Sequence, residues 1–546
     1  MTNFYAPCAV LYLLWTLITV SCEVFTSVYR IESIHRAETT LMKGLTDLVS
    51  KERRDGQSLP DNVITFFHRV EEDEKKAQSN NETVNNPLNF LHIIDRWITG
   101  WDKLPELLFC EKCRKSSNII EFYATYISTK QILIETPHRN DIGGIATAID
   151  RLVDMYNLSV DDLIAGRVKT TEVSPMTLTE LIYVTNALPS YEKEIVWYEA
   201  WIHKMKSNRN TDIEEYKLIY TKLAKAYFKV GEPLTCIKVL KKYLLKDPRN
   251  SDVIVDLERC KKRASAGLQK YEEKIEHYLD EKSMDSYTNY KKLCGGVELR
   301  TPNETKSLRC FNGKTQIPYM ESKKEVLSYD PEVVMFHDVI SDKEAEEIKN
   351  IAIPKMERSF IVSRFKTPAT IGGNYNSPIR VSETAWLEDS DHSLIHKLSR
   401  RIERITGLSL QRRLSSTSDS EALQVLNYGA GGMYIPHVDF FGERLANHDA
   451  PPDLKHSGDR VATWLFYLTD VKFGGSTVFP DIKVQVPVTK GAAAFWYSIQ
   501  KSGVPDNRTL HAGCPVLEGS KWVCNKWIRV AGQFRKRPCG LSRDAV

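Results

Sequence analysis

Neither sign of charge dominates this chain. Its 546 residues include 75 Lys and Arg against 71 Asp and Glu, which gives a net charge of +4. A protein that grips a phosphate backbone as its main task needs a basic excess. We therefore expect no nucleic-acid partner. A hydrophobic content of 42% also excludes a largely disordered chain.

Long apolar runs are also absent, apart from a short one at the N-terminus. Residues 9–20 read AVLYLLWTLITV, with threonine as the only polar residue type. Such a run is shorter than the roughly 20 residues that cross a bilayer, but it fits the apolar part of a signal peptide. We predict a signal peptide at residues 1–22 and no membrane anchor. The absence of Lys or Arg before the run departs from the usual signal-peptide pattern. The alternative interpretation of the run is a buried core helix.

A secreted chain would place its cysteines in an oxidising compartment. Cleavage near Cys22 removes Cys8, with or without Cys22, and leaves nine or ten of the 11 cysteines there, where disulfides persist. The C-terminal residues 542–546 contain no retrieval signal of the KDEL kind, so retention in the endoplasmic reticulum would need a partner. Acceptor patterns for N-linked sugar begin at Asn81, Asn157, Asn303 and Asn507.

The first part of the mature chain, residues 23–140, is predicted to be a helical association domain. The spacing of its apolar residues alternates between three and four, with Glu38 in the polar position of the seam. This pattern indicates a helix that packs against another helix, either within its own domain or in a second chain. The apolar positions are Ile31, Ile34, Leu41, Leu45 and Leu48.

Residues 141–260 are predicted to form a tetratricopeptide-like domain that binds a peptide substrate. Within 223–248, Gly231 permits a close turn between paired helices, and Pro248 lies where the second helix has ended. Aromatic rings on a concave surface can hold a stiff, proline-rich peptide, although packing between helices is the alternative role for each ring. The candidate rings are those of Tyr191, Tyr198, Trp201 and Tyr227.

The chain changes character after about residue 280. Residues 261–332 are predicted to be a linker in which Cys294 and Cys310 bracket a polar loop. From residue 333 to 546, short segments rich in Val, Thr and aromatic residues alternate with Gly and Pro turns. This pattern favours a double-sheet jelly roll over a parallel sheet. The predicted fold class is therefore multidomain α plus β, with a helical N-terminal half and a C-terminal double-stranded β-helix.

One stretch carries recognisable chemistry. In residues 427–440, NYGAGGMYIPHVDF, His437 and Asp439 are two residues apart and so share one face of a strand. His511 ends a later strand-like block, and Lys521 follows it. Two histidines and one carboxylate are typical of non-heme iron(II) oxygenases. Zinc is the alternative metal. Taken singly, His437 fits better as a core histidine and His511 as a surface histidine, but the four residues together favour the site.

The ordered motifs of the C-terminal region resemble the α subunit of collagen prolyl 4-hydroxylase, an iron(II)- and 2-oxoglutarate-dependent dioxygenase of the endoplasmic reticulum. The resemblance covers nearly the whole mature chain, loosely before residue 280 and closely after residue 333. Its sharpest parts are YGAGGMYIPHVD at 428–439, RVATWLFYL at 460–468, GGSTVFP at 474–480, HAGCPV at 511–516 and GSKWVCNKW at 519–527.

The resemblance implies roles for individual residues. His437, Asp439 and His511 would bind iron, and Lys521 would anchor the distal carboxylate of 2-oxoglutarate. Tyr428 and Thr477 would add hydrogen bonds at that end of the co-substrate. The family also implies ascorbate as a cofactor, which rescues oxidised iron. By the same transfer, Arg460 and Trp527 lie near the peptide channel.

The resemblance also implies disulfides and partners. It pairs Cys294 with Cys310 and Cys514 with Cys539. The C-x-x-C spacing of Cys110 and Cys113 would by itself suggest redox or metal chemistry, but without a βαβ context we expect a local disulfide or free thiols there. Cys524 is expected to be a buried thiol. The implied assembly is an α2β2 heterotetramer in the lumen of the endoplasmic reticulum, with protein disulfide isomerase as the β subunit.

The chain departs from the family pattern at Arg529, where a histidine is expected near the other carboxylate of 2-oxoglutarate. Arginine is longer and does not titrate, so we predict altered handling of 2-oxoglutarate. Two hypotheses remain open: an active peptidyl-proline 4-hydroxylase, and a catalytically weak binder of proline-rich chains. A lysyl hydroxylase lacks support, because such enzymes do not usually carry this helical module.

Overall fold

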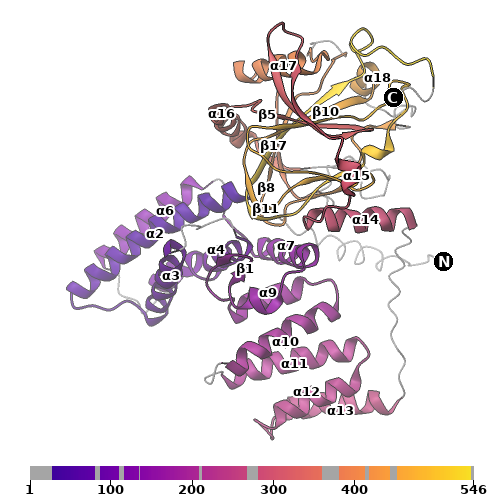
Figure 1. Cartoon of the computed structure of the whole chain (residues 1–546). Helices are drawn as coiled ribbons and strands as arrows, with labels where there is room; N and C mark the ends of the chain where they lie inside the picture. The colour runs from indigo at the N-terminus through magenta and orange to yellow at the C-terminus, as the bar shows by residue number, and fades with distance from the viewer. Residues whose placement is uncertain are drawn as a thin grey trace, which may run out of the picture. The chain divides into compact units, whose positions relative to one another are not determined.

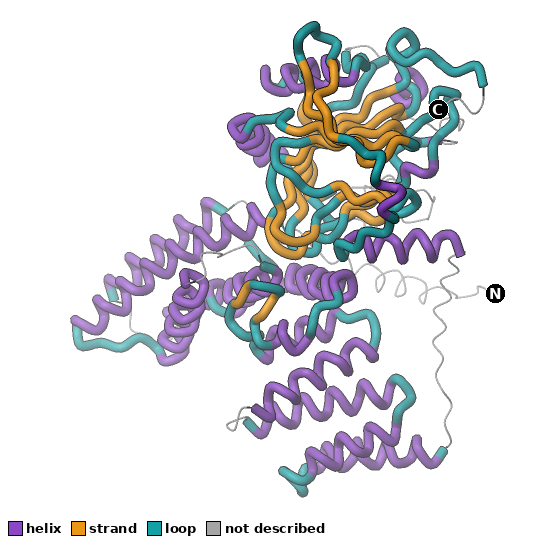
Figure 2. The backbone as a smooth tube through the Cα atoms, viewed as in Figure 1, coloured by secondary structure: helices purple, strands orange, loops and turns teal. Residues whose placement is uncertain are grey.

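The computed structural model describes residues 27–79, 86–109, 116–133, 136–207, 212–266, 281–359, 380–411, 417–442 and 452–542. The chain divides into two compact units. The N-terminal unit comprises residues 1–153 and 158–275, and the C-terminal unit comprises residues 154–157 and 276–546. Figure 2 shows that the strands gather in the C-terminal unit, whereas the N-terminal unit is almost entirely helical.

The N-terminal unit is built from consecutive helices (Figure 1). A short β-hairpin of β1 (Arg167–Val168) and β2 (Thr171–Glu172) interrupts them. The helices are α2 (Val28–Arg54), α3 (Asp61–Ser79), α4 (Pro87–Thr99), α5 (Leu104–Leu108), α6 (Ser117–Ile132), α7 (Arg139–Tyr156), α8 (Val160–Ile164), α9 (Leu178–Ala187), α10 (Tyr191–Ser207), α11 (Ile213–Lys229), α12 (Pro233–Leu244) and α13 (Ser251–Ser265).

Helix α2 packs within its own unit, against α3, α4 and α6. The five predicted seam residues are all buried there. Glu38 is fully buried and accepts hydrogen bonds from Arg96 at 2.7 and 2.8 Å and from the Trp101 indole at 3.0 Å. Burial alone would raise the pKa of Glu38, but the charge and hydrogen bonds of Arg96 lower it to about 2. The polar seam position is therefore an internal ion pair.

The predicted helix pair at 223–248 is present as α11 and α12. Gly231 turns the chain between them with a φ of +83°, a conformation that suits glycine. The preceding helix, α10, buries two of the rings predicted to contact peptide. Tyr198 donates to Thr185, and Trp201 donates to Glu215. The prediction is wrong for these two residues, because their rings fill the spaces between helices.

The C-terminal unit consists mainly of strands. Its helices are α14 (Glu281–Cys294), α15 (Pro302–Thr305), α16 (Asp342–Ala352), α17 (Ser393–Thr406) and α18 (Pro452–Ser457). Its strands are β3 (Cys310–Lys314), β4 (Glu321–Tyr329), β5 (Glu332–His337), β6 (Glu357–Arg358), β7 (Glu383–Leu387), β8 (Leu423–Tyr428), β9 (Tyr434–His437), β10 (Arg460–Tyr467), β11 (Val471–Gly474), β12 (Thr477–Phe479), β13 (Val484–Val486), β14 (Ala493–Tyr497), β15 (His511–Gly513), β16 (Val516–Gly519) and β17 (Lys521–Arg529).

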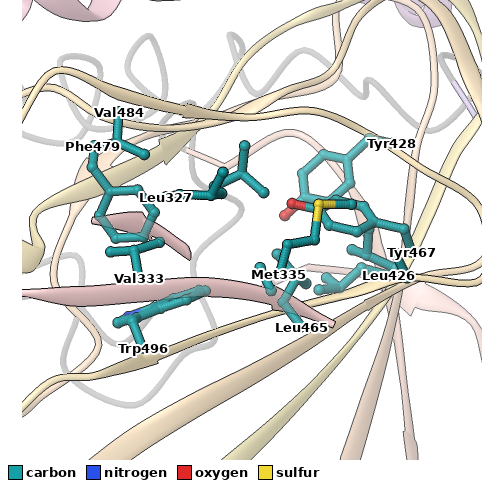
Figure 3. Close-up of a cluster of buried hydrophobic side chains, with 14 of the residues drawn as sticks. Leu327, Val333, Met335, Leu426, Tyr428, Leu465, Tyr467, Phe479, Val484 and Trp496 are labelled. Atoms are coloured by element: carbon teal, nitrogen blue, oxygen red, sulfur yellow. The ribbon is translucent and has the colours of Figure 1, made fainter. Parts of the chain in front are cut away.

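Two antiparallel sheets form the framework of this unit. The larger has nine strands in the order β3-β4-β5-β14-β10-β17-β8-β7-β6, and the smaller has four in the order β13-β12-β15-β9. Residues two apart on β10, β13 and β14 enter one buried cluster, because alternate side chains of a strand share a face. Figure 3 shows Phe479 of the small sheet and Trp496 of the large sheet in this cluster. The predicted helical N-terminal half and β-rich C-terminal domain are confirmed.

The large sheet begins earlier than expected. Strands β3 and β4 lie within residues 261–332, where we predicted a linker; β3 pairs with β4, and β4 pairs with β5. The polar, mostly exposed sequence of β3 hides its strand character. Helix α14 also comes from this segment, and it contacts β12 and β13 of the small sheet.

The predicted disulfide pairings are wrong. Cys294 at the end of α14 is bonded to Cys514, just after β15, while Cys310 and Cys539 are exposed free thiols. The reason is the packing of α14 against the small sheet, which brings Cys294 beside Cys514. A second disulfide, Cys236–Cys260, joins α12 to α13. Cys524 is a buried free thiol, as expected, and burial raises its pKa.

Several predictions concern residues outside the described part of the chain. These include the signal peptide at 1–22, the glycosylation candidate Asn81, and the pair Cys110 and Cys113. The other candidate asparagines, Asn157, Asn303 and Asn507, are exposed. In the described ranges, no helix combines the length and apolar character needed to cross a membrane.

Candidate iron and co-substrate site

The two predicted histidine ligands face one another across a strand pair. His511 opens β15 and is the register partner of His437, the last residue of β9. Asp439 follows two residues later, with carboxylate oxygens 3.9 Å from His437 Nε2 and 3.6 Å from His511 Nε2. One potential ligand atom from each residue lies within 4.8 Å of the others. Among the described residues, this is the one metal-ligating cluster of its kind.

Both imidazoles are held in the tautomer that metal binding requires. His437 Nδ1 donates to the Ile435 carbonyl at 2.8 Å, and His511 Nδ1 donates to the Thr509 carbonyl at 3.0 Å. Each Nε2 therefore keeps its lone pair for a metal ion. Burial and the neighbouring His511 lower the pKa of His437 to about 3, so its ring is neutral at physiological pH.

A buried hydroxyl group orients the carboxylate ligand. Thr463 on β10 donates to Asp439 Oδ2 at 2.6 Å, and both side chains are buried. Burial alone would raise the pKa of Asp439, but His511, His437 and Arg460 hold it below its usual value. The carboxylate is therefore ionised. Two imidazoles and one carboxylate form the donor set that suits iron(II).

Lys521 fits the far end of 2-oxoglutarate. It is buried at the start of β17, where its register partner is Tyr428, and its Nζ lies 5.5 Å from the centre of the Tyr428 ring. Burial lowers the pKa of Lys521 to about 7, and no carboxylate among the described residues opposes this shift. A buried ammonium group without a counter-ion suits an anionic ligand.

Small and polar residues surround this ammonium group. Gly513 leaves space beside it, because a Cβ at that position would lie 3.8 Å from Lys521 Nζ. Thr477 pairs with Gly513 across the small sheet and accepts a hydrogen bond from Tyr467 at 2.9 Å. In Figure 3, Tyr428 and Tyr467 lie at one end of the core cluster. The predicted residues Tyr428, Thr477 and Lys521 thus occupy one region.

A network of charged residues continues from Asp439. Arg460 on β10 donates to Glu421 at 2.6 and 2.9 Å, and more weakly to the Asp439 carbonyl at 3.4 Å. Its guanidinium lies 3.5 Å from the centre of the Trp527 ring. Burial favours a neutral Glu421, but Arg460 and Arg529 lower its pKa, so it is ionised.

Arg529 joins the same network. It is the register partner of Arg460 and lies 2.8 Å from Glu421 through Nε. Its Nη1 donates to the Gly458 carbonyl at 2.7 Å. These contacts with Glu421 and Gly458 fix the Arg529 side chain. Arg529 therefore helps to hold Glu421 in place, and through Glu421 it helps to position Arg460. A contact between Arg529 and 2-oxoglutarate stays a prediction.

Sequence reasoning missed two residues of the site, Thr463 and Glu421. Thr463 is a polar residue inside the apolar strand sequence VATWLFYL, on the same face as Leu465 and Tyr467, and that interruption was the available signal. Glu421 precedes β8 without a motif around it. Its partners come from β10 and β17, so local sequence carries no comparable signal for it.

Comparison with known proteins matches both parts of the chain. Residues 27–170 match "Prolyl 4-Hydroxylase alpha-subunit, N-terminal region", and residues 423–529 match "2OG-Fe(II) oxygenase superfamily". Prolyl 4-hydroxylase subunit alpha-1 of Rattus norvegicus is 29% identical over 93% of this chain and 97% of its own length. Prolyl 4-hydroxylase subunit alpha-3 of Bos taurus is 31% identical over 87% of each chain. This chain belongs to the prolyl 4-hydroxylase α-subunit family.

The oxygenase match of this prolyl 4-hydroxylase family member spans the iron ligands, Lys521 and Arg529. The chain is accordingly a 2-oxoglutarate- and iron(II)-dependent oxygenase of the prolyl 4-hydroxylase type. Among solved structures, the viral collagen prolyl hydroxylase vCPH of Paramecium Bursaria Chlorella virus-1, in complex with 2OG, is 26% identical. The alignment covers 36% of this chain and 95% of that chain, with a TM-score of 0.27.

Proposed function

We propose that this chain hydroxylates peptidyl proline to 4-hydroxyproline in collagen-like or other proline-rich secreted proteins. The reaction uses O2 and 2-oxoglutarate and releases succinate and CO2. The observation that carries the proposal is the convergence of His437, Asp439 and His511 in the unit that also buries the unbalanced ammonium group of Lys521. These two features provide for a metal ion and for a dicarboxylic co-substrate.

Each residue of the site has a specific role in the proposed reaction. His437, Asp439 and His511 would hold iron(II), which together with 2-oxoglutarate supplies oxidation of a C–H bond by O2. Lys521 would pair with the distal carboxylate of 2-oxoglutarate, and Tyr428 and Thr477 would donate hydrogen bonds to it.

The remaining residues would position the partners of the reaction. Thr463 keeps Asp439 in its ligating orientation. Arg460 and Trp527 would line the approach for the peptide, and Glu421 holds Arg460 in place. Ascorbate would return oxidised iron to the ferrous state.

We further propose that the chain works in the lumen of the endoplasmic reticulum in an α2β2 heterotetramer with protein disulfide isomerase. The match to the N-terminal region of prolyl 4-hydroxylase α subunits supports an assembly role for residues 27–170. The two disulfides support an oxidising compartment.

A second candidate is a secretory-pathway binder of proline-rich chains with weak or no catalysis. The observation that favours it is Arg529, which stands where the resemblance leads us to expect histidine and is held by Glu421. The complete set of three ligands and Lys521 favours the enzyme instead.

Co-expression with a disulfide isomerase, followed by measurement of succinate release with and without a Pro-Pro-Gly repeat peptide, separates the two candidates. The enzyme predicts peptide-dependent release that is lost in His437→Ala. Iron content, measured on both proteins, should fall in the same variant. Tight retention of peptide with no succinate release from iron-loaded wild type would contradict the enzyme and support the binder.

A further inference from the structure

A groove of about 630 Å³ lies in the N-terminal unit, and none of its lining residues has a role in the proposed chemistry. Three consecutive helices, α11, α12 and α13, form it, and Figure 1 shows these helices stacked in chain order. Its lining comprises Leu218, Thr221, Lys222, Ala224, Lys225, Phe228, Lys229, Cys236, Leu240, Asp256, Arg259 and Cys260. A groove of this size accommodates a short stretch of extended peptide.

Helical spacing places the cations of α11 on the groove. Lys222, Lys225 and Lys229 recur at intervals of three and four residues, so they follow one face of the helix. Arg259 faces them from α13. The next turn of α13 adds Arg263, whose guanidinium lies 4.6 Å from the centre of the Phe228 ring.

The floor of the groove is apolar and covalently fixed. Leu218, Phe228 and Leu240 supply carbon surface beneath the charged side chains. The disulfide between Cys236 and Cys260 links α12 to α13, and both cysteines are buried in the lining. A linked floor limits how far these two helices can separate, so a peptide would meet a preformed surface.

The cations outnumber the acidic groups. The lining contains one carboxylate, Asp256, and it lies 3.4 Å from Arg259 on its own helix. Within the described residues, Lys222, Lys225 and Lys229 take part in no ion pair. Lys222 and Lys225 act on Glu194 of α10 from a distance: burial raises the pKa of this carboxyl, and the two lysines partly oppose the shift. Three lysines without an ion pair therefore lie around an apolar floor, and Arg259 faces them with its charge partly balanced by Asp256.

Aromatic surface is scarce in the same groove. Phe228 is the one aromatic residue among the described residues of its lining. Of the rings predicted to hold a proline-rich peptide, Tyr198 and Trp201 are buried elsewhere and Tyr227 donates to Glu199. The fourth, Tyr191, is exposed but is not part of the lining, and its ring centre lies 6.0 Å from Lys229 Nζ. The chemistry of this groove is therefore cationic and aliphatic rather than aromatic.

We propose that the groove binds an extended segment of the polypeptide substrate that carries Asp or Glu side chains beside apolar residues. The chain would thereby select acidic stretches near its target prolines, an inference that rests on the proposed peptidyl-proline hydroxylase function. Carboxylates would pair with the lysines of α11 and with Arg259, while apolar side chains would cover Leu218, Phe228 and Leu240.

Binding of fluorescent peptides to the full-length protein, without 2-oxoglutarate, tests this specificity. The probes are repeats of Pro-Glu-Gly, Pro-Pro-Gly and Pro-Lys-Gly. We expect Pro-Glu-Gly to bind most tightly, with an affinity that falls as salt concentration rises. Lys222→Gln combined with Lys225→Gln should weaken Pro-Glu-Gly binding about fivefold, since two exposed ion pairs are lost. Equal affinity for the three peptides would overturn the proposal.

A matched control separates local from general charge effects. Lys238→Gln with Lys242→Gln removes the same charge from exposed positions of α12 outside the groove, and it should leave binding unchanged. The reversal Lys222→Glu with Lys225→Glu should shift preference toward Pro-Lys-Gly, a gain that misfolding does not produce. If the reversal leaves the ranking of the peptides unaltered, the proposal fails.

Succinate release, measured with the same peptides, distinguishes failure of the groove from failure of the enzyme. Charge-dependent binding without peptide-stimulated release would retain the groove and reject the hydroxylase. Peptide-stimulated release with charge-independent binding would retain the hydroxylase and reject the groove.

Discussion

Lys521 carries its ammonium group into the interior of the C-terminal unit without a carboxylate to balance it. Its pKa of about 7 lies below that of an ordinary lysine, so the folded chain binds fewer protons than the unfolded chain between these two pKa values. The free energy of unfolding therefore gains a contribution as pH rises through that window. The ammonium form that a dicarboxylate requires becomes scarce over the same range.

We predict that affinity for 2-oxoglutarate falls as pH rises above about 7, by up to about tenfold per pH unit, because binding must then take up one proton. Equilibrium binding of 2-oxoglutarate to the metal-loaded protein across this range provides the measurement. Lys521→Arg is the control, since its guanidinium stays charged and should flatten the pH profile. A wild-type profile that is already flat would contradict the role of Lys521.

Thr463 acts on iron through Asp439. We predict that Thr463→Val lowers iron(II) affinity about tenfold or more, because the carboxylate loses the hydrogen bond that orients it. Anaerobic titration with iron(II) measures the effect, and Thr463→Ser should restore most of it by returning the hydroxyl group. If Val and Ser variants bind iron alike, the hydroxyl group has no positioning role.

Arg529 differs from the residue that the family resemblance leads us to expect. Arg529→His introduces a shorter ring that titrates and removes the contact with Glu421. We predict a changed Michaelis constant for 2-oxoglutarate and a higher turnover, by about threefold, as the surroundings of the co-substrate change. Steady-state kinetics of variant and wild type provide the test. Identical constants in both proteins would defeat this expectation.

At the residue scale, the sequence was most informative where chemistry is concentrated in short motifs. His437 and Asp439 could be paired because His511 follows their close spacing, although Asp439 lies just beyond β9 and not on it. The role of Lys521 followed from the resemblance of the ordered motifs. Thr463 and Glu421 could not be assigned, because their partners come from other strands. A hydrogen bond or ion pair between distant segments depends on register, which the printed sequence does not reveal.

At the scale of elements, α14 is joined to the small sheet by Cys294–Cys514. We predict that Cys294→Ser with Cys514→Ser lowers the free energy of unfolding of this unit by about 4 kcal/mol, because the bond closes a long loop. Thermal melting and non-reducing peptide mapping provide the measurements. Cys310→Ser with Cys539→Ser is the matched control and should melt like wild type, since both thiols are exposed and free. The reverse outcome would favour the pairings expected from the family resemblance.

The prediction of helices and strands succeeded where glycine and proline residues mark a turn or the end of a helix locally. Gly231 and Pro248 mark the turn and the end of the α11–α12 pair, and both act on their own backbone. Strand β3 was missed because its exposed residues show no alternation between apolar and polar positions. The disulfides were mispaired for a related reason: contact between α14 and the small sheet is a tertiary event.

At the scale of the whole molecule, the proposed peptide groove and the candidate iron site belong to different units. We predict that His437→Ala abolishes succinate release but changes the affinity for Pro-Glu-Gly peptide by less than about twofold, as expected for independent sites. Conversely, Lys222→Gln with Lys225→Gln should raise the Michaelis constant for that peptide and leave the constant for 2-oxoglutarate unchanged. Peptide anisotropy and steady-state kinetics test both halves. Loss of peptide affinity in His437→Ala would show that the two sites are coupled.

The pairing of His437 with His511 across β9 and β15 has a consequence for maturation. A one-residue slip between these strands would turn one imidazole away from the other, because neighbouring side chains point to opposite sides. A chain with this register shift would then be unable to retain the iron ion, even if its helices had formed. Iron binding would thus favour newly made chains in which β9 and β15 have the correct register. Those chains would also have the residues that hold the co-substrate in place.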